Sequence, residues 1–335
     1  MNLSDSTPVR SILRCMLILA ALSLPQVLQA QWQVTAGAQS TDHGTQALAF
    51  LPNEIWIHPG DSITWTFPSD EIHTVSFLST IPVAEIRPPF PVGCPPGPPP
   101  GITPDNSPFD GTTCVNGGPS AGGQTYTVNF PTPGNYKLVC LVHENMTAVV
   151  HVQSGALPHD QAFYDQQAAA ERNALLSDTD HHTGNPHSGH SHGSNVVTAG
   201  IGEAVATAGG SQSLSIVRFL HPATVVHVGE IVEWTNEDPA TPHTITFGDQ
   251  AGNPIPPSPN VFVDADGARH AVINSIHDRV HSGFIVAAPQ ERIGLAQAPL
   301  GVTRFRITFT HAGTFPYLCV LHDNLGMKGE VIVLP

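Results

Sequence analysis

The chain has 335 residues, of which only 12% are charged, so it is long enough for two domains of ordinary size and is expected to fold rather than stay disordered. Its formal net charge is −15 with 12 Lys and Arg residues, which makes nucleic acid and anionic membrane surfaces poor partners. A basic protein partner is compatible with this charge.

The first 30 residues are expected to form a secretory signal. Arg10 and Arg14 precede an apolar stretch from Cys15 to Leu28, and Ala30 suits the last residue before cleavage. An uncleaved membrane anchor is the alternative, but the stretch contains Pro25 and is short for a span of about 20 residues. We therefore expect a periplasmic or otherwise exported protein that has no membrane span after signal removal.

Residues 31–155 are expected to form a first β-rich domain. Its segments are short, alternate with period two and are separated by Gly, Pro, Asn and Asp turns, as Phe50–Trp65 and Tyr126–Phe130 illustrate. Cys94 and Cys114 lie in a Pro/Gly-rich insertion that has little capacity to pack by itself. In an oxidising compartment these two cysteines are predicted to form a disulfide; a soft-metal pair is the weaker alternative, because no histidine lies nearby.

Residues 156–195 differ in composition and are expected to link two domains. Pro158–Ser177 is rich in Ala and Gln and lacks internal Gly or Pro, which predicts one helix that is entered through Pro158 to Asp160 and connects or braces the domains. A flexible tract follows, with five histidines among Gly and Ser: His181, His182, His187, His190 and His192. This tract could capture copper or zinc as a possible accessory metal site, or it could be a soluble linker that happens to be rich in histidine.

Residues 196–335 are expected to repeat the fold of the first domain. Three segments of the first half align with three of the second: Phe50–Trp65 with Phe219–Trp234, Glu71–Phe77 with Thr241–Phe247, and Tyr126–Phe130 with Phe305–Phe309. The sequence therefore predicts an all-β protein with two copies of one antiparallel sandwich or barrel.

Each copy closes with a loop that carries a cysteine, a histidine and a methionine. These loops are Cys140–Met146 and Cys319–Met327, and a histidine from an earlier strand is expected to join each of them. The predicted metal ligands are His73, Cys140, His143 and Met146 in the first copy, and His243, Cys319, His322 and Met327 in the second. A thiolate, two imidazoles and a weak axial thioether favour copper, whereas structural zinc prefers four strong ligands.

With these motifs, both halves resemble cupredoxins, the blue copper proteins, over residues 31–152 and 195–335. The first loop, C-x2-H-x2-M, is similar to that of amicyanins, and the second, C-x2-H-x4-M, to that of plastocyanins and pseudoazurins. The resemblance implies two tandem Greek-key β-sandwiches, each with a type 1 copper, and one-electron transfer with a redox protein partner in the periplasm. One departure is Thr74 and Thr244, since an Asn often follows the first ligand histidine in cupredoxins. The hydrogen bonding around the sulfur is therefore expected to differ.

Three classes of function are compatible with two such sites: an electron carrier, a protein for copper storage, delivery or resistance, and a two-domain copper oxidase or nitrite-reductase-like enzyme. The enzymes require a histidine beside the ligand cysteine, but Val139 and Leu141 flank Cys140, and Leu318 and Val320 flank Cys319. A full ligand set in both copies exceeds what storage needs. We therefore expect an electron-transfer protein that is not an enzyme, with two centres of unequal potential because the loops differ in length.

Overall fold

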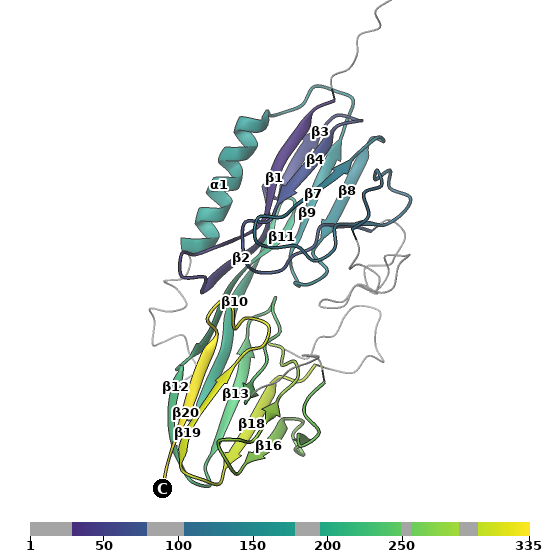
Figure 1. The fold of residues 1–335 in the computed structure, drawn as a ribbon. Helices are drawn as coiled ribbons and strands as arrows, with labels where there is room; N and C mark the ends of the chain where they lie inside the picture. Colours follow the sequence, from purple (N-terminus) through teal and green to yellow (C-terminus); the bar gives the residue numbers. More distant parts are fainter. Residues whose placement is uncertain (1–28, 79–103, 178–194, 249–255, 288–300) are drawn as a thin grey trace, which may run out of the picture.

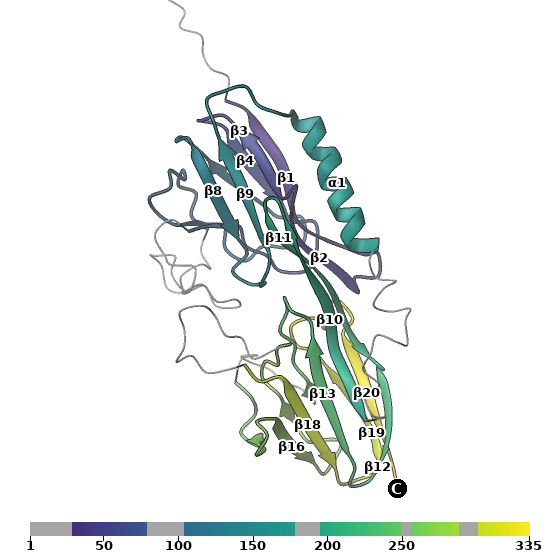
Figure 2. The same ribbon diagram turned by 180° about the vertical axis from the view of Figure 1, so that it is seen from behind.

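A computed structural model describes residues 29–78, 104–177, 195–248, 256–287 and 301–335. In this part of the chain, two β-sandwiches lie end to end, and one helix lies against the first (Figure 1). The predicted all-β fold, two tandem Greek-key sandwiches with a helical connection, is confirmed. Figure 2 shows the same arrangement from behind. Residues 1–28 of the predicted signal and the five histidines of the linker tract fall outside the described residues.

Among the described residues, the first sandwich contains nine strands. They are β1 (Gln31–Gln39), β2 (Thr45–Leu51), β3 (Glu54–Ile57), β4 (Ser62–Thr66), β5 (Ser76–Phe77), β6 (Val115–Asn116), β7 (Thr125–Asn129), β8 (Gly134–Val139) and β9 (Thr147–Val152). One layer has the order β2-β1-β4-β7, and the other has the order β3-β9-β8-β5-β6. Two strand pairs are parallel, β1 with β4 and β3 with β9.

The second sandwich repeats this topology with extra strands. They are β10 (Val196–Thr207), β11 (Gly210–Leu220), β12 (Ala223–His227), β13 (Ile231–Glu237), β14 (Thr246–Phe247), β15 (Phe262–Val263), β16 (Arg269–Ile273), β17 (Val280–His281), β18 (Arg304–Phe309), β19 (Gly313–Leu318) and β20 (Lys328–Leu334). Its layers are β11-β10-β13-β18-β16-β15 and β12-β20-β19-β14-β17. The parallel pairs recur as β10 with β13 and β12 with β20. Trp65 and Trp234, which end the aligned segments, are both buried in the cores of their sandwiches.

A long hairpin joins the two sandwiches. Strand β11 pairs antiparallel with β2 of the first sandwich from Ser213 opposite Leu48 to Ile216 opposite Thr45, and it meets β9 where Ser211 lies opposite Thr147. Figure 1 shows β10 and β11 running from one sandwich toward the other. The sequence predicted a linker alone, whereas hydrogen-bonded strands also connect the copies.

The predicted helix is α1 (Gln161–Ser177), and it packs against the first sandwich (Figure 1). Asp160 caps its first turn, because its carboxylate accepts a hydrogen bond from the N–H of Phe163 at 3.0 Å. Tyr164 is buried in the first core, and Glu171 accepts hydrogen bonds from the Asn53 N–H and the Gln212 side chain. The helix thus braces the first sandwich at its junction with β11. No helix among the described residues has the length and apolar character to cross a bilayer.

Candidate metal centres

The first candidate centre lies where the loop after β8 meets the segment before β5. His73 forms an isolated bridge with Ser120, while Cys140 and His143 lie between β8 and β9. The N–H of Cys140 donates to the carbonyl of Met146 at 3.0 Å, which closes the loop and brings the two residues side by side. The ligand atoms of His73, Cys140 and His143 lie within 4.8 Å of one another, and all three side chains are buried.

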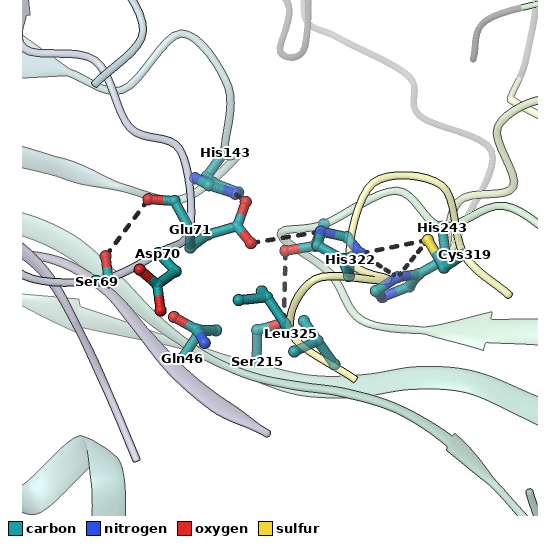
Figure 3. Close-up of polar contacts among 12 residues, drawn as sticks. Gln46, Ser69, Asp70, Glu71, His143, Ser215, His243, Cys319, His322 and Leu325 are labelled. Carbon is teal, nitrogen blue, oxygen red and sulfur yellow. Dashed lines mark hydrogen bonds and ion pairs between the residues drawn. The ribbon is translucent and has the colours of Figure 1, made fainter. Parts of the chain in front are cut away.

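The second centre repeats this construction around Cys319 (Figure 3). Its sulfur lies 3.3 Å from Nδ1 of His322 and 3.9 Å from Nδ1 of His243, and the two Nδ1 atoms are 3.2 Å apart. The N–H of Cys319 donates to the carbonyl of Met327 at 3.1 Å, and the Met327 side chain is buried. The fold therefore brings the expected cysteine and histidine donors together in both copies.

These donor sets fit a resident metal ion. Donor atoms that share a metal at about 2.0–2.3 Å lie about 3–4 Å from each other, and the second centre has this spacing. In the first, neither ring nitrogen of the buried His73 has a hydrogen-bond partner within the described ranges. Buried polar atoms without partners are rare, so these nitrogens suit a role as metal donors. Thiolate, imidazole and thioether donors together favour copper.

The electrostatics of both centres favour the thiolate form that a metal requires. Burial opposes ionisation, but a hydrogen bond from His143 and the charges of His143 and His73 hold the pKa of Cys140 well below its usual range. The charge of His322, with hydrogen bonds from both histidines, has the same effect on the pKa of Cys319. Conversely, although burial opposes it, Cys140 and Glu71 raise the pKa of His143 to about 10 in the metal-free protein.

Thr74 and Thr244 supply hydrogen bonds around the sulfur. The N–H of Thr74 donates to Cys140 Sγ at 3.4 Å, and its hydroxyl oxygen accepts from the Leu141 N–H at 2.7 Å. Thr244 makes the corresponding contacts with Cys319 Sγ at 3.3 Å and with the Val320 N–H at 2.9 Å. Threonine therefore ties each loop to the segment before β5 or β14 that carries the first histidine.

Two glycines that sequence reasoning missed shape the centres. Gly37 and Gly200 each have a φ of +77° and lie at irregularities in β1 and β10. A Cβ atom on either would collide with the ring of the first histidine of the candidate centre, His73 or His243. A signal was present in the sequence, because Val-Thr-Ala-Gly occurs at both 34–37 and 197–200.

Two buried carboxylates were also missed. Glu71 Oε1 lies 3.2 Å from Nε2 of His143, and its Oε2 lies 3.5 Å from Nε2 of His322 in the other sandwich (Figure 3). Asp238 Oδ2 lies 3.6 Å from Nε2 of His243. Burial opposes ionisation of Glu71, but the charges of His322 and His143 lower its pKa to about 2. The sequence shows Glu71 two residues before His73, but it gives no sign that Glu71 contacts His322 in the second copy.

Several predicted site residues are not placed. Cys94 and the histidines of the linker tract, His181, His182, His187, His190 and His192, fall outside the described residues. Cys114 is disulfide-bonded, while Cys140 and Cys319 are free. The pairing of Cys114 with Cys94 stays a prediction.

Comparison with known proteins gives one family match. Residues 37–153 match the model of the copper binding proteins of the plastocyanin/azurin family. Among solved structures, amicyanin from Paracoccus versutus is similar at 18% identity over 42% of this chain and 79% of its own, with a TM-score of 0.22. The oxidized form of plastocyanin from Dryopteris crassirhizoma is similar at 19% identity over 42% of this chain and 99% of its own, also with a TM-score of 0.22. No curated protein matches the sequence.

Proposed function

We propose that this chain is a copper-binding electron-transfer protein with a type 1 site in each sandwich, because residues 37–153 match the model of the plastocyanin/azurin family of copper binding proteins. His73, Cys140, His143 and Met146 would hold copper in the first sandwich, and His243, Cys319, His322 and Met327 would hold it in the second. Bound copper supplies one-electron cycling between Cu(I) and Cu(II).

The observation that carries the proposal is the pair of equivalent, buried donor groups. The protein contributes a rigid donor set in each copy, because a backbone hydrogen bond closes each loop and a threonine ties it to the neighbouring strand. Burial of the donors excludes water. A site held in this way rearranges little when the oxidation state changes, which favours rapid electron exchange.

A carrier is favoured over an enzyme by the residues beside the ligand cysteines. Val139 and Leu141 flank Cys140, and Leu318 and Val320 flank Cys319, so no imidazole leads from either sulfur to a neighbouring metal cluster. The second reactant would be a redox protein. The net charge of −15 is compatible with a basic partner.

We further propose export, with a signal at 1–30, a first domain at 31–155, a linker at 156–195 and a second domain at 196–335. Two features support export: the apolar stretch that follows Arg10 and Arg14, and the disulfide of Cys114, which is typical of oxidising compartments.

The test is an absorption spectrum with copper analysis of the purified, copper-loaded protein. We expect an intense blue colour and two coppers per chain. Cys140→Ser and Cys319→Ser should each remove one copper and part of the blue band. His227→Ala, which changes an exposed histidine outside both centres, should leave colour and stoichiometry unchanged. A colourless protein, or a blue band that survives both cysteine substitutions, would contradict the proposal.

A further inference from the structure

Glu71 lies between the two candidate centres and contacts one ligand histidine of each (Figure 3). Its two carboxylate oxygens are divided between the sandwiches, with Oε1 at 3.2 Å from His143 Nε2 and Oε2 at 3.5 Å from His322 Nε2. Nδ1 of each histidine points the other way, toward its own cysteine sulfur, at 3.7 Å in the first centre and 3.3 Å in the second. One side chain therefore connects the two donor sets.

The surroundings hold this bridge in place and keep water from it. His143 and His322 are each 2% exposed, and Glu71 is 7% exposed. Beside them the N–H of Glu144 donates to the carbonyl of Ala240 across the interface at 3.2 Å, and Ala240 packs into the core of the first sandwich.

A second contact also ties the loop from Cys319 to Met327 to the first sandwich. The guanidinium of Arg218 donates to the carbonyls of Leu325 and Asp42, each at 2.7 Å. Leu325 belongs to the loop from Cys319 to Met327, and Asp42 belongs to the first sandwich. Arg218 thus ties the loop to the sandwich that carries Glu71.

The chemistry of the contact suits two filled centres. A histidine that binds a metal through Nδ1 carries its proton on Nε2, and an ionised carboxylate can only accept hydrogen bonds. With both centres filled, His143 and His322 would each donate one hydrogen bond to a different oxygen of Glu71. Partners of this kind orient metal-ligating histidines and tune the metal.

Building on the proposed function, we propose that Glu71 is a shared positioning residue that links the two metal centres and sets both of their reduction potentials. A buried negative charge beside both ligand sets stabilises the more positive, oxidised state of each, because few water molecules screen it. Oxidation of one centre strengthens its N–H bond to the carboxylate and weakens the bond to the other centre. The second centre then becomes harder to oxidise.

The experiment compares Glu71→Gln with Asp70→Asn in spectroelectrochemical titrations of the copper-loaded protein. Both substitutions remove one carboxylate charge, but Asp70 is half exposed and contacts His43 and Gln39 instead of a ligand histidine. For Glu71→Gln, the reduction equilibrium constant of both centres should rise at least tenfold, which is about 59 mV for a one-electron couple. Asp70→Asn should shift each centre by less than half of that potential. A shift at one centre only, or at neither, with both coppers bound, overturns the proposal.

The link between the centres is measured separately. The potential of the first centre should be higher in the wild type with the second centre oxidised than in Cys319→Ser, which lacks the second thiolate. The difference in potential between these two proteins should become smaller when both of them also carry Glu71→Gln. A difference of the same size with and without Glu71 would show that the charges of the two centres act directly on each other.

A wild-type measurement keeps the proposal testable if Glu71→Gln fails to fold or loses copper. In Zn(II)-loaded protein followed by NMR, the Nε2–H protons of His143 and His322 should both exchange slowly with water and show contacts to the Glu71 side chain. Rapid exchange of either proton overturns the link. Because zinc has no redox chemistry, this result also separates failure of the link from failure of the electron-transfer proposal.

Discussion

The imidazole of His243 occupies the space that a side chain at Gly200 would need. Gly37 makes the same contact with His73 in the first sandwich. Both glycines have a positive φ, which other L-residues adopt at a cost of about 1–2 kcal/mol. Each glycine therefore fixes where the first histidine of its centre can lie.

We expect Gly37→Ala and Gly200→Ala to lower copper affinity at least tenfold, each at its own centre only. The added methyl group would push the ligand histidine away from its cysteine. Copper titration followed by the blue band measures the loss. Gly229→Ala is the matched control, since Gly229 has a φ of +88° and open space around its α-carbon. It should cost about 1 kcal/mol of stability and leave both centres intact. Full copper affinity in Gly200→Ala would show that this contact does not position His243.

Much of the fold could be predicted from the sequence, because the signals are local. Alternating residues in Phe50–Trp65 and Phe219–Trp234 mark strands with one buried face, and the repeat argues for one topology used twice. The helix followed from the absence of Gly and Pro after Asp160. The candidate metal donors of the two loops could be predicted for the same reason, since Cys, His and Met lie close together on each loop.

The remaining features could not be predicted because they depend on contacts between distant segments. The pairing of β11 with β2 brings the two loops together, and no local pattern in either strand specifies the partner. The contact of Glu71 with His322 follows from that pairing, so it was invisible as well. The roles of Gly37 and Gly200 could have been suspected from the repeated Val-Thr-Ala-Gly, but the histidine ring above them could not.

Thr74→Val should destabilise the metal-free protein by about 1–3 kcal/mol, the cost of leaving a buried donor without its partner. The lost partner is the hydroxyl oxygen, which accepts the Leu141 N–H at 2.7 Å beside the ligand cysteine. Urea denaturation measures the change. Thr74→Ser, which keeps the hydroxyl group, should retain most of the stability and the colour of the first centre. A loss in Thr74→Ser as large as that in Thr74→Val would show that the hydroxyl group does not account for the effect.

The second centre should have the lower reduction potential. Its first histidine has a buried carboxylate, Asp238, at 3.6 Å, which stabilises the oxidised state. Hydrogen bonds to sulfur do not separate the centres, because each sulfur accepts two of them: Cys140 from the N–H groups of Thr74 and Val142, and Cys319 from the N–H and the hydroxyl of Thr244. Redox titrations of Cys140→Ser and Cys319→Ser isolate the two centres. Asp238→Asn should raise the potential of the second centre and leave the first within experimental error. Equal potentials, or the reverse order, would refute this assignment.

The stability of the metal-free protein should be greatest between about pH 6.5 and 8.5. The pKa of Cys140 is lowered in the fold, so its contribution is present above the unfolded value of about 8.5 and is lost as the pH falls. The pKa of His143 is raised to about 10, so its contribution is present below about 6.5 and is lost as the pH rises. Between about pH 6.5 and 8.5, the stability gained through Cys140 as the pH rises cancels the stability lost through His143.

Acid should weaken the fold further through Glu71. Its pKa of about 2 lies below the usual carboxyl value of about 4.3, so its contribution is present above that value and is lost as the pH falls toward 2. Chemical denaturation at pH 3, 5, 7.5 and 10 measures the whole profile. A maximum of the free energy of unfolding at pH 5 or below would contradict the pKa shifts of Cys140, His143 and Glu71.

The strand β11 belongs to the sheets of both sandwiches, and this makes the protein less modular than its duplicated sequence suggests. A fragment that ends before β10 would expose the edge of β2, and an open strand edge invites pairing with other chains. Severing the segment between Ser177 and Asn195 would leave the pairing of β11 with β2 in place. The unit that folds, and that would be inherited or engineered as a whole, is accordingly the pair of sandwiches.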